Sequence, residues 1–128
     1  MTRAVIPAAV LAVVLTCAAG CGHEAANSNY HFRAEEGVHM VEVAVQSWAV
    51  DHHGHFPPPE VVNAEGVWVA EGVDGDWPTN PWSGEPMAQG TGAGDFTYTL
   101  GPDARSATIV LHGVDGEVLR TNALGRKQ

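Results

Sequence analysis

The chain is poor in basic residues. It has six Lys and Arg against 15 Asp and Glu, and its formal net charge is −9 at pH 7. A nucleic-acid partner requires a basic patch, and attraction to anionic lipid headgroups requires one as well. We therefore expect no nucleic-acid partner, and we expect any attachment to a membrane to be made through a lipid.

Catalytic motifs are also missing. The sequence contains no Gly-x-Ser-x-Gly, no His-Glu-x-x-His, no phosphate-binding loop and no dinucleotide-binding glycine motif. Asp74-Gly75-Asp76 resembles the start of a calcium loop, but Pro78 occupies the next ligand position. These absences predict a protein that is not an enzyme.

Cysteine is scarce, and both cysteines lie near the N-terminus. Arg3 is followed by an apolar run, Val5 to Leu15, and then by Ala18-Ala19-Gly20-Cys21. This order resembles a bacterial lipoprotein signal, in which the cysteine after the small residues becomes the acylated N-terminus. An uncleaved anchor or an ordinary secretory signal is the alternative. Cleavage before Cys21 would also remove Cys17, so the mature chain could form no internal disulfide.

This interpretation divides the 128 residues into three parts. Residues 1–20 are the predicted signal peptide, residues 21–29 are a small polar tether with a covalent lipid on Cys21, and residues 30–128 form one head domain. We therefore expect an exported protein of the cell envelope that is anchored to a membrane by its lipid, with no other cofactor.

The head begins with a stretch of helical spacing. Apolar residues recur at three- and four-residue steps, which predicts one buried side of a long helix: Val38, Val41, Val45 and Trp48. Polar residues occupy the side predicted to face solvent: Glu35, His39, Glu42, Gln46 and His53. Gly54 and the prolines at 57–59 predict the end of this helix.

The second half of the head predicts a small antiparallel sheet. Phe96, Tyr98 and Leu100 alternate with threonines, as do apolar residues at 107, 109 and 111 with their neighbours. Asp115-Gly116 predicts a hairpin turn. Residues 117–121 then close the hairpin, and we expect a frayed tail after Asn122.

The segment between helix and sheet, residues 57–94, is rich in glycine and proline and carries Trp68, Trp77 and Trp82. We expect an ordered loop lying against the helix, because a disordered segment would not contain so many aromatic residues. The tryptophans are predicted to belong to the core, with a ligand platform as the alternative. Val67-Trp68-Val69 predicts either a short strand or a plug in the core.

Three segments together carry a family resemblance. The first is the end of the helix, with Trp48, Ala49, Val50, Asp51, Gly54, Phe56 and Pro57; the others are residues 77–87 and 94–99. In this order they resemble the head domain of type II secretion major pseudopilins and related type IV pilin-like proteins. The family's leader cleavage site and long apolar stem helix have no counterpart here, so the resemblance covers the head alone.

The resemblance implies an α+β fold, with one long N-terminal helix packed on a three- or four-stranded antiparallel sheet. It also implies a structural or interaction role beside a secretion or pilus-like machine, with proteins of that machine as partners. The outer side of the helix and the loop around Trp77, Asn80 and Trp82 are the expected contact surfaces.

Three histidines lie close together where the helix is predicted to end. His52, His53 and His55 follow Asp51, and imidazole nitrogens bind zinc, copper or nickel well. The main prediction is a solvated helix C-terminus, where imidazoles suit the negative end of the helix dipole. The alternative is an envelope lipoprotein that binds a small ligand or a metal through this region.

Overall fold

The computed structural model describes residues 29–125, and residues 31–125 belong to one compact unit. A long helix occupies residues 29–51. Two short helices follow it: the 3-10 helix η2 (Pro59–Val61) and the four-residue helix α2 (Val67–Ala70). The chain then forms three strands, β1 (Phe96–Leu100), β2 (Ser106–His112) and β3 (Val118–Gly125). A 3-10 turn, η3 (Val114–Gly116), connects β2 to β3. The predicted signal peptide and Cys21 lie outside the described residues.

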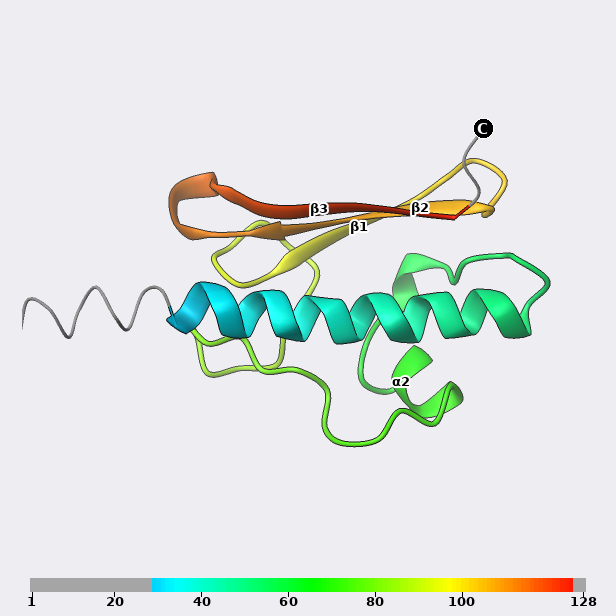
Figure 1. The fold of residues 1–128 in the computed structure, drawn as a ribbon, viewed down its shortest axis with the longest axis horizontal. Coiled ribbons are helices and arrows are strands. Elements are labelled where there is room, and N and C mark those ends of the chain that lie inside the picture. Colours follow the sequence, from blue (N-terminus) through cyan, green and yellow to red (C-terminus); the bar gives the residue numbers. More distant parts are fainter. Residues whose placement is uncertain (1–28, 126–128) are drawn as a thin grey trace, which may run out of the picture. The chain divides into compact units, whose positions relative to one another are not determined.

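The long helix packs one side against a three-stranded antiparallel sheet, so the predicted α+β class is confirmed (Figure 1). Val38, Val41 and Val45 are completely buried, and Trp48 is half-buried against the same core. Figure 1 shows the strands on one side of the helix and α2 on the other. The prediction of an N-terminal helix is wrong for the whole chain, because residues 1–28 precede the described helix.

The sheet is a meander with the order β1-β2-β3. Phe96 pairs with Leu111 across β1 and β2, and Tyr98 pairs with Ile109; all four side chains are buried. The predicted alternation of both strands is therefore confirmed. The expected frayed tail after Asn122 is wrong, because β3 continues to Gly125 and buries Leu124 opposite Ala107.

Tyr98 connects the sheet to the segment that follows the helix. Its hydroxyl donates a hydrogen bond of 2.7 Å to the carbonyl oxygen of Pro57. Burial raises the pKa of Tyr98 well above its usual range, because a tyrosinate would lose its hydration in the core. The side chain thus remains a neutral donor that fixes the proline segment beneath the sheet.

The loop between η2 and β1 is ordered by its tryptophans. Val67 and Trp68 are buried in α2, so the core plug is confirmed and the short strand is wrong. The indole N–H of Trp68 donates to the carbonyl of Gly75 at 2.9 Å, and Trp77 donates to that of Met87 at 2.9 Å. The two indoles meet edge to face at 5.3 Å, as aromatic pairs prefer, which places both in the core.

The long helix ends in a left-handed turn. His53 has φ 58° and Gly54 has φ 85°, and the backbone N–H of Gly54 donates to the carbonyl of Ala49 at 2.7 Å. This bond from the sixth residue back to the first is the Schellman motif, which usually places glycine at the position that His53 occupies. A side chain with a Cβ is disfavoured there.

Replacing His53 by glycine is expected to raise the free energy of unfolding by about 0.5–1 kcal/mol, because glycine adopts the left-handed conformation without strain. Urea denaturation of the full chain, followed by tryptophan fluorescence, measures the change. His55→Gly is the matched control, since His55 is also exposed but does not have a positive φ. Equal effects of the two substitutions would contradict the strain at His53.

Candidate functional site

Asn80, one of the predicted contact residues, is buried and organises its own loop. Its side-chain amide donates to the carbonyl of Ala93 at 2.7 Å and to Oδ1 of Asp95 at 3.1 Å. Its Oδ1 accepts the backbone N–H groups of Trp82 at 2.8 Å and Ser83 at 3.3 Å. These four bonds join two parts of the loop that lie more than ten residues apart, so Asn80 serves the fold.

The structure places the other two predicted contact residues differently. Trp77 is buried in the core, whereas Trp82 is half-buried and packs against the core from outside. The ring of Trp82 lies 5.7 Å from that of His31 on the long helix. Of the three residues, Trp82 offers the most surface to a partner.

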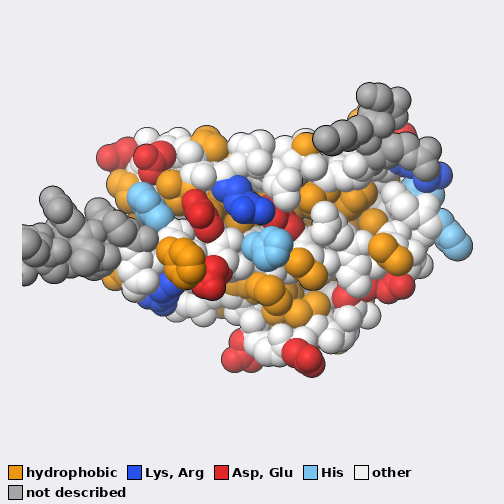
Figure 2. Space-filling model, in the orientation of Figure 1, with side chains coloured by type: hydrophobic (Ala, Val, Ile, Leu, Met, Phe, Trp, Pro, Cys, Tyr) orange, Lys and Arg blue, Asp and Glu red, His pale blue; other side chains and the backbone are white. Residues whose placement is uncertain are grey.

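The outer side of the long helix exposes apolar side chains. Four exposed apolar residues are spaced eight, three and seven positions apart, which places them on one face of the helix. They are Phe32, Met40, Val43 and Val50. Val50 is 81% exposed and Phe32 62% exposed. We call these four residues the outer stripe. Figure 2 shows hydrophobic side chains at the surface over the long helix, between charged and histidine side chains.

The sequence pattern misplaced Glu42, which was expected to face solvent. Its side chain is 2% exposed and pairs with Arg120 of β3 through two hydrogen bonds, at 2.8 Å and 3.2 Å. Arg120 is opposite Leu111 in the sheet, and so lies on the face toward the helix. The hydrogen bond to Glu42 raises the pKa of Arg120, against the lowering effect of burial.

This ion pair could have been suspected from Arg120, which is the single basic residue in the predicted closing strand. Nδ1 of His39 lies 3.5 Å from the same Glu42 carboxylate, but the His39 side chain is exposed. The group joins helix to sheet at their contact. It holds the two layers together.

The histidines at the helix end are exposed, and two of them are engaged by their own backbone. His52 stacks on Trp48 at 4.1 Å, and its Nδ1 lies 2.7 Å from the Trp48 carbonyl oxygen. Nδ1 of His55 lies 3.0 Å from the carbonyl oxygen of His52. Across residues 29–125, no three His, Cys, Asp or Glu side chains are grouped so that they could hold a metal ion. Metal binding by His52, His53 and His55 stays a prediction that zinc titration would test.

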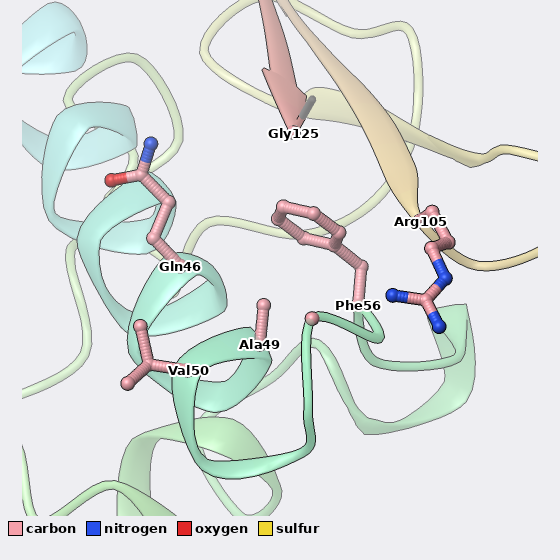
Figure 3. Close-up of a pocket in the computed structure, with 7 residues that line it drawn as sticks. Gln46, Ala49, Val50, Phe56, Arg105 and Gly125 are labelled. Carbon is pink, nitrogen blue, oxygen red and sulfur yellow. The ribbon is translucent and has the colours of Figure 1, made fainter. Parts of the chain in front are cut away.

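A pocket of about 320 Å³ lies beside this turn. Its wall is formed by the end of the long helix, by the turn after the helix, and by the residue before β2 and the end of β3. The lining residues are Gln46, Ala49, Val50, Gly54, Phe56, Arg105 and Gly125. Figure 3 shows the helix side chains on one side of the Phe56 ring and the Arg105 guanidinium on the other. The lining is apolar apart from Gln46 and Arg105.

The chain matches no family model, no curated protein and no solved structure. Among the described residues, no helix combines the length and the hydrophobicity that crossing a membrane requires.

Proposed function

We propose that this protein is an exported lipoprotein, anchored to a membrane through Cys21, whose head is a structural or interaction component of a secretion or pilus-like assembly. The observation that carries this proposal is the long helix, which buries one side in the core against a three-stranded antiparallel sheet and exposes the outer stripe on another side. The chain order of helix, aromatic loop and sheet agrees with the resemblance to pilin-like heads.

The outer stripe is the contact surface that this function requires. Single exposed apolar residues are ordinary, but a row along one helix face is typical of a site that another protein covers. Met40 and Val43 lie in the middle of the row, where contact residues usually contribute most to binding. The acidic balance of the chain favours a partner whose facing surface is basic or neutral.

The partner contact can be tested by affinity purification of the tagged full chain from solubilised membranes. We expect proteins of a secretion or pilus-like assembly to be recovered, and recovery to fall at least tenfold for Met40→Glu combined with Val43→Glu, because charges would be buried at the interface. Val69→Glu is the matched control, since Val69 is exposed on α2 and is not part of the stripe. Equal recovery with the double variant would contradict the stripe as the contact surface.

A further inference from the structure

The pocket at the helix end has the features of a ligand site. Its volume of about 320 Å³ lies at the lower end of the range for small-molecule pockets, ~300–1,000 Å³. Ala49, Val50 and Phe56 supply apolar wall, and Gln46 and Arg105 supply polar groups at its edges (Figure 3). A mostly apolar lining with a few polar groups is the usual composition of such a site.

Two glycines keep the wall of this pocket free of side chains. A Cβ at Gly125 would lie 3.2 Å from the Phe56 ring and 2.5 Å from the Arg105 carbonyl oxygen. A Cβ at Gly54 would lie 3.3 Å from Nη1 of Arg105. Both glycines also have positive φ, so the backbone that shapes the pocket favours the residue that leaves it open.

Arg105 is a cation without a carboxylate partner in the described part of the chain. Its Nη1 donates to the backbone carbonyl of His53 at 3.4 Å, a neutral acceptor. The carboxylate of Asp103 accepts the backbone N–H of Arg105 instead. By contrast, Arg120 is paired with Glu42. Among residues 29–125, no acidic residue lines the pocket, although the chain as a whole is strongly acidic.

We propose that this pocket binds a small monocarboxylic acid with an apolar body, whose carboxylate pairs with Arg105. The guanidinium can donate two parallel hydrogen bonds to a carboxylate, which makes it the preferred partner for that group. The apolar body lies against Phe56, Ala49 and Val50, and the Gln46 amide lies at the opposite edge. The proposal does not rest on the partner contact, because Arg105, which would hold the carboxylate, is not part of the outer stripe.

Octanoate is a suitable probe because it combines a carboxylate with a flexible apolar body. Isothermal titration into the full chain, held in phosphatidylcholine nanodiscs and corrected with empty nanodiscs, should show saturable binding at one site. We expect Arg105→Gln to lower the affinity for octanoate at least tenfold, because the carboxylate pairs with the guanidinium. The affinity for the uncharged octan-1-ol should not change. Acetate, which lacks the apolar body, should give no measurable binding.

Val50→Asp places a negative charge at the pocket edge and should lower the affinity for octanoate to a similar extent. The control substitution Val69→Asp, on α2, should leave this affinity unchanged. Both valines are exposed, so neither substitution is expected to disturb folding, and circular dichroism checks this. Equal octanoate affinity in the wild type and Arg105→Gln, or no binding up to millimolar octanoate, would overturn the proposal. Binding of acetyl-leucyl-leucine without binding of octanoate would also overturn it, in favour of a peptide carboxyl terminus.

Discussion

Replacing Asn80 by alanine is expected to lower the free energy of unfolding by about 3 kcal/mol. The side chain is 2% exposed and makes four hydrogen bonds within the loop. Alanine would leave the carbonyl of Ala93 and the N–H groups of Trp82 and Ser83 without these partners in part-buried positions. A fully buried unpaired group costs about 1–3 kcal/mol, and a part-buried group costs less. Urea denaturation of the full chain, followed by tryptophan fluorescence, measures the loss.

Ser83→Ala is the control in the same loop. The Ser83 hydroxyl accepts one exposed hydrogen bond, from the N–H of Glu85 at 3.1 Å. Its loss should change the free energy of unfolding by less than about 0.5 kcal/mol. If Asn80→Ala were as mild as Ser83→Ala, the loop would not depend on Asn80, and the residue would again be a candidate for a contact role.

Arg120→Ala is expected to lower the free energy of unfolding by about 3 kcal/mol, since it leaves the buried Glu42 carboxylate without its partner. The two hydrogen bonds between these side chains cross from helix to sheet, so their loss affects the contact on which the fold depends. The same denaturation measurement applies. His39→Ala, which removes only the exposed neighbour of Glu42, should change stability by less than about 0.5 kcal/mol.

The double substitution Glu42→Leu with Arg120→Leu distinguishes a buried pair from two unrelated contacts. Replacing both members of a buried ion pair by apolar residues is often neutral or stabilising. We therefore expect the double variant to recover most of the stability that Arg120→Ala loses. A larger loss in the double variant than in Arg120→Ala would show that the two charges contribute independently.

Much of the fold could be predicted from periodicity. Val38, Val41 and Val45 follow the helical repeat, and Phe96 and Tyr98 alternate, because each element buries one side against the same core. The loop could not be predicted in the same way. Val67–Ala70 has β-favouring valines, yet it forms a helical turn, because placing Trp68 in the core overrides local preference.

The candidate sites were only partly predictable. Glu42 lies at the edge of the apolar arc, and its direction is decided by Arg120, which is 78 residues away in the sequence. The pocket is built from the helix end, the following turn and two distant strand ends, so no local motif marks it. The resemblance drew attention to the segment around Asn80, and the structure shows that this side chain is used inside the loop.

Incorporation of labelled palmitate by cells that produce the full chain tests the proposed anchoring most directly. The account predicts that the label is attached to the wild type, and that Cys21→Ser abolishes it and releases the head from the membrane fraction. Persistent labelling of Cys21→Ser, or an unlabelled wild type, would contradict a lipoprotein anchored at Cys21.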